Sequence, residues 1–272
     1  MVARRNPTVP RRTVLVAGCP VQTTVTARPA IARRWLYTTL WRSRRQLHSG
    51  GGLTVGLGVQ WTPPFRKLPS GAEPRPATLQ LCVGNRCLVF QLARAGGAGV
   101  PHILRRFLSD GRVTFAAYNV ESDRRKLRAH HGLEVASALE LRSAGGGLGS
   151  ASMATMADRL LGIRHGVDKS RKVGVSRWHV STLSKKQVRY AAVDAYISCR
   201  LGVCLRRRRA AMASESESEA EYSDNDDVQS TASSDEYEYD YGIASWDRDR
   251  DDRRSEAEVD DHLYDSISMC SY

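Results

Sequence analysis

Apolar and polar positions alternate along residues 53–61, and this period of two predicts a β-strand. The apolar positions of this segment are Leu53, Val55, Leu57, Val59 and Trp61. Gly58 and Gln60 lie two residues apart, so they share the opposite face of the strand. Short β-branched or apolar runs bounded by turn residues predict further strands. These lie at residues 12–16, 21–27, 78–83, 87–92 and 113–118.

Apolar residues at helical spacing predict helices between and after these strands. The predicted helices cover residues 30–47, 100–108, 120–131, 152–161 and 184–206. Ser184 and Gln187 fit a capping box at the start of the last one. The Gly-rich segment 144–150 follows no clear strand and is interpreted as a loop rather than a nucleotide-binding motif. Because strands and helices come to alternate along the chain, the pattern predicts an α/β fold in which helices cover a sheet.

The charged residues divide the chain into two parts of opposite sign. Residues 1–213 hold 37 Lys and Arg against 9 Asp and Glu, whereas residues 214–272 hold 4 against 20. The second part is rich in Ser, Asp, Glu and Tyr and poor in aliphatic residues, which is typical of a disordered segment. We therefore expect a flexible basic N-terminus at 1–11, a folded domain at 12–209 and a disordered acidic tail at 210–272.

The basic domain indicates a polyanionic partner, above all nucleic acid, either DNA or RNA. The acidic tail could bind a basic protein partner or fold back on the domain. The chain contains no apolar run of about 20 residues and no secretory signal, so we expect an intracellular protein without a membrane span, in the nucleus or the cytoplasm. Ten Arg and no acidic residue in the first 49 positions leave import into an organelle as a less favoured alternative.

None of the six cysteines lies in a CxxC pair or in a Cys/His array with zinc spacing, so a structural zinc site is not expected. Cys82 and Cys87 flank Val-Gly-Asn-Arg, and a two-residue turn at Gly84-Asn85 would place them opposite each other on a hairpin. In an intracellular protein, two reduced thiols are favoured over a disulfide at this position.

Three polar residues on the predicted helices are candidates for a catalytic site. Tyr190 and Asp194 are four residues apart and share one helix face. Asp123 lies in the first turn of the helix at 120–131, where a carboxylate also complements the helix dipole. Each feature alone is common on protein surfaces. Only their order along the chain, after the strand at 53–61 and the hairpin, is specific.

In this order of elements the chain resembles the DEDDy group of 3′-5′ exonucleases, and in particular the Werner-type exonuclease domain proteins of plants. The resemblance implies a ribonuclease-H-like fold, with a mixed sheet flanked by helices. It also implies phosphodiester hydrolysis from a 3′ end by two divalent metal ions, Mg²⁺ or Mn²⁺. Metal binding would fall to Asp123 and Asp194, and orientation of the attacking water to Tyr190.

The chain departs from this family in its first motif, which usually reads G-L-D-x-E-W and here reads Gly-Leu-Gly-Val-Gln-Trp at residues 56–61. Gly58 offers no side-chain ligand, and Gln60 keeps an acceptor oxygen without the negative charge that hard cations favour. We therefore expect a degenerate two-metal site with weak or lost hydrolysis. The alternative hypothesis is a non-catalytic nucleic-acid-binding or protein-interaction module that uses the basic domain and the acidic tail.

Overall fold

The computed structural model of the chain describes residues 11–63, 74–95, 99–145, 147–165, 167 and 170–221. The chain divides into two units, residues 1–215 and 216–272. In the second unit only residues 216–221 are described, and they are helical. Everything below on sheet, core and site concerns the first unit.

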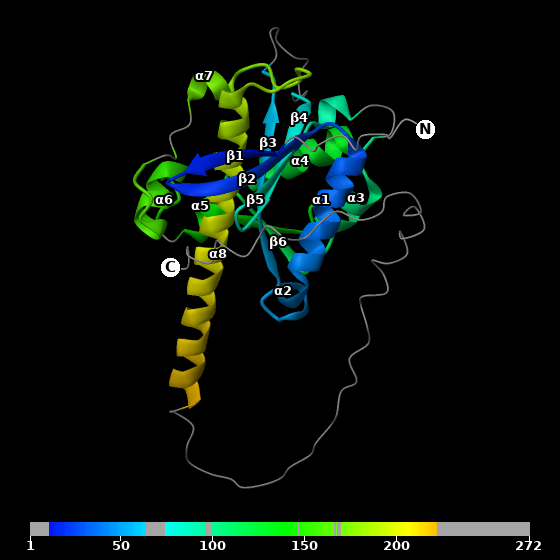
Figure 1. Cartoon of the computed structure of the whole chain (residues 1–272). Coiled ribbons are helices and arrows are strands. Elements are labelled where there is room, and N and C mark those ends of the chain that lie inside the picture. The colour runs from blue at the N-terminus through cyan, green and yellow to red at the C-terminus, as the bar shows by residue number, and fades with distance from the viewer. Residues whose placement is uncertain are drawn as a thin grey trace. The chain divides into compact units, whose positions relative to one another are not determined.

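Within the described residues of this unit, seven strands form one mixed sheet in the order β1-β2-β5-β4-β3-β6-β7 (Figure 1). The strands are β1 (Arg11–Val16), β2 (Cys19–Thr26), β3 (Leu53–Trp61), β4 (Pro76–Val83), β5 (Arg86–Phe90), β6 (Val113–Ala117) and β7 (Ser137–Glu140). The pairs β2/β5, β3/β6 and β6/β7 are parallel, and the remaining neighbours are antiparallel. The α/β fold with a mixed sheet is therefore confirmed.

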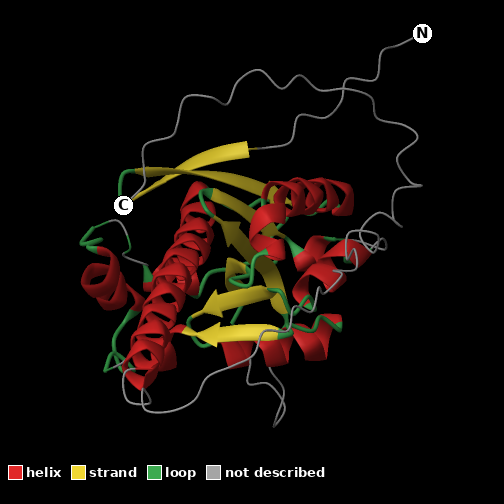
Figure 2. Cartoon of the chain, turned by 90° about the horizontal axis from the view of Figure 1, so that it is seen from below, coloured by secondary structure: helices red, strands yellow, loops and turns green. Residues whose placement is uncertain are grey.

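Helices cover both faces of the sheet. They are α1 (Pro29–Arg42), α2 (Arg44–His48), α3 (His102–Leu108), α4 (Val120–His131), α5 (Leu141–Ala144), α6 (Met153–Leu161), α7 (Arg171–Gly174) and α8 (Lys185–Glu221), with a short 3-10 turn at Leu92–Arg94. In Figure 2, α8 lies on one side of the sheet, and α1 and α3 lie on the other. None of the helices in the described ranges combines the length and the apolar character needed to cross a bilayer.

The predicted elements recur with a few differences that have local causes. The helix expected at 30–47 is broken at Ser43, which separates α1 from α2. The last helix continues past the expected end at 206 to Glu221, because residues 207–221 are mostly Arg, Ala, Ser and Glu and contain neither Gly nor Pro. The start expected for the acidic tail, residue 210, thus falls inside α8. Most of that tail, residues 222–272, and most of the N-terminal segment 1–11 lie outside the described residues.

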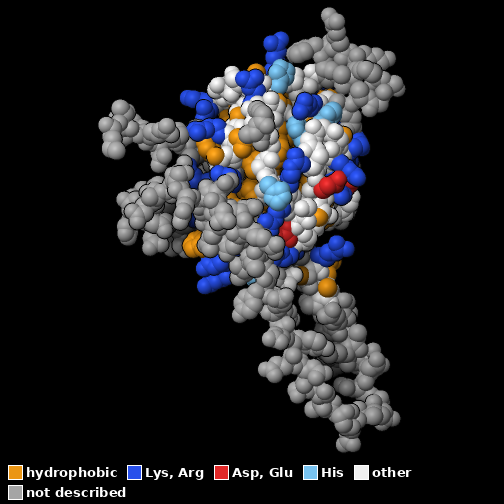
Figure 3. Space-filling view, turned by 90° about the vertical axis from the view of Figure 1, so that its right-hand side faces the viewer, with side chains coloured by type: hydrophobic (Ala, Val, Ile, Leu, Met, Phe, Trp, Pro, Cys, Tyr) orange, Lys and Arg blue, Asp and Glu red, His pale blue; other side chains and the backbone are white. Residues whose placement is uncertain are grey.

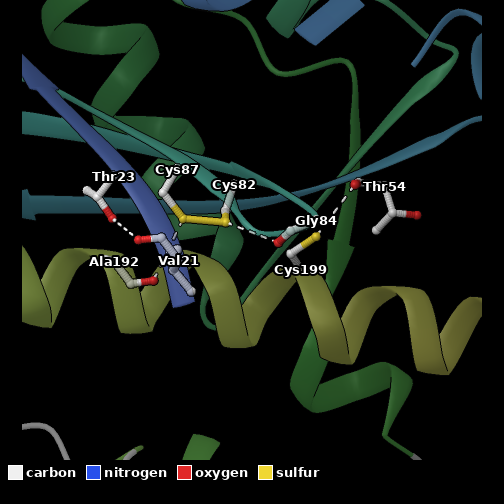
Figure 4. The surroundings of a disulfide bond; sticks show 8 residues. All are labelled: Val21, Thr23, Thr54, Cys82, Gly84, Cys87, Ala192 and Cys199. Carbon is white, nitrogen blue, oxygen red and sulfur yellow. Dashed lines mark hydrogen bonds between the residues drawn. A yellow bond between two sulfur atoms is a disulfide. The ribbon is translucent and has the colours of Figure 1, made fainter. Parts of the chain in front are cut away.

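The cysteine pair of the hairpin corrects one sequence-based expectation. Cys82 and Cys87 form a disulfide, with their Cα atoms 4.2 Å apart (Figure 4). The turn at Gly84-Asn85 places the two residues directly opposite each other in the β4/β5 register, as predicted. The expectation of two reduced thiols was wrong because it weighed the cellular compartment above this register.

The backbone of α8 lies directly against β3. A Cβ added at Gly56 would lie 1.9 Å from the Ala195 carbonyl oxygen and 2.6 Å from the Cys199 nitrogen. A Cβ added at Gly202 would lie 2.4 Å from the Ala116 Cβ atom. Burial raises the pKa of the Cys199 thiol, which stays protonated and donates a hydrogen bond to the Thr54 carbonyl oxygen at 3.8 Å. Two glycines therefore let the helix backbone rest directly on the sheet.

Gly56→Ala is expected to lower the free energy of unfolding by about 3 kcal/mol, because backbone rather than a side-chain end must move to admit the methyl group. Urea denaturation followed by circular dichroism measures this change. Gly111→Ala is the matched control, since its added Cβ meets nothing within 4 Å and the change should stay within about 1 kcal/mol. Equal stability of the two variants would contradict the close packing of β3 on α8.

Candidate functional site

The contact between β3 and α8 brings three of the predicted site residues together. Gly58 and Gln60 follow Gly56 on the face of β3 that meets α8. The Gln60 Nε2 atom donates a hydrogen bond to the Asp194 Oδ2 atom at 3.1 Å. A Cβ added at Gly58 would lie 3.3 Å from the same carboxylate oxygen. Residues separated by more than 130 positions thus converge on one small polar region.

Gln80 belongs to this region, although the sequence analysis did not single it out as a site residue. It lies opposite Gly58 in the β3/β4 register, and its Oε1 atom is 2.8 Å from the place of a Gly58 Cβ. The Gln80 side chain is fully buried and donates from Nε2 to the Thr78 Oγ1 atom at 2.6 Å. Its Oε1 atom accepts no hydrogen bond from any described residue. The sequence does contain a signal for Gln80: it is the only amide side chain in the largely apolar segment that forms β4.

Asp123 lies just beyond the end of β6, the strand next to β3. It lies in the first turn of α4, which packs against β3 and β4 and begins directly after β6. Because β6 is parallel to β3, the carboxyl ends of both strands meet at the same edge of the sheet. The Asp123 side chain is buried, with 8% of its surface exposed. Asp123 therefore lies at the same edge of the sheet as the carboxyl end of β3, which carries Gly58 and Gln60.

The start of α4 is capped by another carboxylate, Glu140 of β7. It accepts hydrogen bonds from the backbone nitrogens of Asn119 at 3.0 Å and Val120 at 2.8 Å. Asn119 itself has left-handed backbone geometry, with φ of 68°, and its side chain makes no cap. Glu140 thus satisfies two of the backbone amides at the start of the helix. This long-range cap could not be read from local sequence.

Tyr190 lies one turn before Asp194 on α8, and its ring is fixed by α7 and the loop that follows. The Tyr190 and Trp178 rings are 5.8 Å apart between centroids. A Cβ added at Gly174 would lie 2.8 Å from the Tyr190 hydroxyl oxygen. The buried Trp178 donates from Nε1 to the Gly174 carbonyl oxygen at 3.0 Å, which ties the two contacts together. The absence of a side chain at Gly174 therefore leaves the space that the Tyr190 hydroxyl occupies.

The predicted capping box supports this arrangement at the start of α8. The Ser184 Oγ atom accepts from the Gln187 nitrogen at 3.2 Å, and the Gln187 Oε1 atom accepts from the Ser184 nitrogen at 3.0 Å. Gln187 also donates from Nε2 to the Arg177 carbonyl oxygen at 2.8 Å, next to Trp178. The capping box is confirmed, and it links the helix to the loop that holds Tyr190.

A buried ammonium group lies beside the site. Lys126, one turn after Asp123 on α4, is only 5% exposed. Its Nζ atom is 4.6 Å from the centroid of the Trp61 ring, which follows Gln60 on β3, and it donates to the Ser122 hydroxyl. The burial of Lys126 leaves no mark in the sequence, because a lysine on an amphipathic helix is normally solvated.

The donor atoms gathered here are those of a mixed amide and carboxylate site. The part of the chain that the structure describes contains no group of three or more His, Cys, Asp or Glu residues arranged to hold a metal ion. Around Gly58 the donors are one carboxylate, Asp194, and the two amides of Gln60 and Gln80. Oxygen donors of this kind suit hard cations, although amides do so without charge.

Sequence comparison places these features in a family. Residues 68–208 match the 3′-5′ exonuclease family, and the chain belongs to that family. The matched range contains Gln80, Asp123, Tyr190 and Asp194. It begins after β3, so Gly58 lies outside it.

Two relatives illustrate the extent of the similarity. A 3′-5′ exonuclease of Arabidopsis thaliana is 30% identical over 158 residues, which cover 54% of this chain and 50% of the relative. A 3′-5′ exonuclease of Drosophila virilis is 28% identical over 153 residues, which cover 53% of this chain and 44% of the relative. The chain thus spans about half the length of the curated relatives it matches.

Solved structures share the fold at low sequence identity. The catalytic core of RRP6 from Trypanosoma brucei aligns with a TM-score of 0.56 and 12% identity, covering 74% of this chain and 50% of that one. RNase D from the same organism, solved in complex with RNA U12, aligns with a TM-score of 0.51 and 14% identity, covering 67% and 62%. The expected ribonuclease-H-like exonuclease fold is therefore confirmed.

Gly174→Ala is expected to cost about 1 to 3 kcal/mol of unfolding free energy, because the new methyl group would press on the Tyr190 hydroxyl. The same change in a Tyr190→Phe background should cost less, since the hydroxyl oxygen is gone and the next ring atom is 3.3 Å away. Urea unfolding of the four proteins of this double-mutant cycle measures the coupling. An equal cost in both backgrounds would show that Gly174 does not position the hydroxyl.

Proposed function

We propose that this chain is a nucleic-acid-binding member of the DEDDy exonuclease group, close to the Werner-type proteins, whose own hydrolytic activity is weak or lost. The observation that carries the proposal is the meeting of Gly58 and Gln60 with Asp194. This is where the family resemblance calls for two further carboxylates, and the chain supplies a glycine and an amide instead.

The remaining donors fit a pair of divalent ions poorly. Two ions about 3.5 to 4 Å apart need several shared carboxylate oxygens, and only Asp123 and Asp194 remain for that purpose. The Asp194 Oδ2 atom already accepts the Gln60 amide, so a cation would have to displace this hydrogen bond. When bound, Mg²⁺ or Mn²⁺ would supply an activated water and neutralise phosphate charge. The neutral side chains around Gly58 would bind such an ion poorly, and would therefore support neither the activation of water nor the neutralisation of phosphate charge.

The residues that remain would still bind and orient a 3′ end. Tyr190, held by Gly174 and Trp178, would keep its hydroxyl in place to orient a water molecule. The buried Lys126 would add positive charge beside Asp123. Because misplacing reacting groups by about 1 Å can cost ~10²-fold in rate, these residues alone would leave little hydrolysis.

The substrate class follows from charge and family together. The first 213 residues carry a large excess of Lys and Arg, which favours the phosphate backbone of nucleic acid. Both DNA and RNA present that backbone, so both belong in the test. Recruitment of a protein partner by the acidic tail remains a separate part of the proposal.

The test compares the natural chain with a variant in which both carboxylates are restored. With Mg²⁺ or Mn²⁺ on 3′-recessed DNA and on single-stranded RNA, the natural chain should show no trimming that Asp194→Ala removes. Gly58→Asp combined with Gln60→Glu should raise trimming by about 10²-fold or more, because the metal ligands return. Gel analysis of end-labelled products measures both rates.

A Cβ at position 58 presses on Gln80, so the variant should be made with Gln80 and with Gln80→Ala. Gly58→Asn with Gln60 unchanged is the matched control, since it has the shape of the aspartate variant without the charge. Trimming by the natural chain that depends on Asp194 would overturn the proposal. So would failure of both restored variants to trim while they remain folded.

A further inference from the structure

Helix α1 exposes a row of arginine and aromatic side chains. Its buried side consists of Ala32, Trp35, Leu36 and Thr39. On the opposite side, Arg33, Arg34 and Trp41 are exposed and Tyr37 is half-buried. Arg33, Tyr37 and Trp41 follow one another at intervals of four, so they form one line along the helix. This line is about 12 Å long at 1.5 Å per residue.

Among the described residues, Trp41 is the aromatic side chain that remains largely exposed. Its side chain is 65% exposed, although tryptophan is one of the largest apolar side chains available to a core. The Arg44 guanidinium lies 4.7 Å from the Trp41 ring centroid and donates from Nη1 to the Trp41 carbonyl oxygen at 3.1 Å. Arg44 thus holds its guanidinium over the ring of Trp41, three residues before it.

The charge of this surface has one sign. No Asp or Glu occurs among the first 72 residues of the chain, and α1 and α2 together expose Arg33, Arg34, Arg42, Arg44 and Arg45. Figure 3 shows the side that carries α1 and α3 in Figure 1. Lys and Arg side chains are spread over the described part of it, and few Asp or Glu side chains are visible. A polyanion with flat aromatic groups complements such a surface in both charge and shape.

We propose that the exposed face of α1 and α2 is a second binding site, for single-stranded nucleic acid. A base would stack on Trp41, and the arginines beside it would contact successive phosphates. At ~3.4 Å per nucleotide, the 12 Å line would span about three nucleotides. The face lies across the sheet from α8, so it is distinct from the site at Gly58 and Asp194, and binding there needs no hydrolysis (Figure 2).

Fluorescence anisotropy of the full chain with labelled single-stranded DNA and RNA tests this site. Trp41→Ala should weaken binding about 10-fold or more, because stacking on an aromatic side chain is lost. Trp41→Phe should retain part of the affinity, since a smaller ring remains. Met212→Ala is the matched control: Met212 on α8 is similarly exposed, at 70%, but is not part of the face. The Met212→Ala variant should bind with the same affinity as the natural chain.

Salt dependence separates the arginines from the tryptophan. Arg33→Ala with Arg34→Ala should reduce the slope of log affinity against log salt by about 1.4, at ~0.7 per phosphate contact, whereas Trp41→Ala should leave the slope unchanged. Unchanged affinity of Trp41→Ala would overturn the proposal. An equal loss for poly-glutamate and oligonucleotides would also overturn it, because the face would then bind acidic chains such as proteins in general. The trimming rates of the natural chain and of the carboxylate-restored variants do not depend on this face, so failure here is distinct from failure of the nuclease proposal.

Discussion

The site depends on one packing constraint, the direct contact of the α8 backbone with β3 through Gly56. Any side chain at that position would collide with the Ala195 carbonyl oxygen, 1.9 Å from where a Cβ would lie. On the helix, the absence of a side chain at Gly202 likewise leaves room for Ala116 of β6. This contact sets the height of α8 above the sheet, and with it the position of Asp194 over Gly58. The position of the polar region therefore follows from backbone packing.

That constraint also brings amide side chains next to the Asp194 carboxylate. The Gln60 amide replaces charge with a hydrogen bond to Asp194, which is a stable arrangement in the absence of a cation. The buried Gln80 Oε1 atom, with no partner among the described residues, lies where a side chain at Gly58 would be. Unsatisfied buried acceptors cost about 1 to 3 kcal/mol and are uncommon. The region beside Gly58 therefore holds a buried polar acceptor for which the described residues provide no donor.

Local sequence patterns predicted the elements that have clear periodicity. The alternation along β3 was recognisable because one face is apolar, and the capping box at Ser184 was recognisable because it needs only four residues. Strand β7 was missed because its four residues are all half-buried and show no alternation. The roles of Gln80 and Glu140 and the burial of Lys126 could not be predicted, because each depends on a partner from a distant element. The exposed Trp41 was likewise invisible, since periodicity locates a helix face without showing how much of it the fold covers.

Under the proposed function, the site lacks the charge to hold divalent ions tightly. Isothermal titration of the natural chain with Mn²⁺ tests it directly, with Asp194→Ala as the reference. The natural chain should bind no more tightly than about 1 mM and should resemble Asp194→Ala, because the two carboxylates of Asp123 and Asp194 beside two neutral amides give little affinity. Micromolar binding that Asp194→Ala abolishes would contradict the claim.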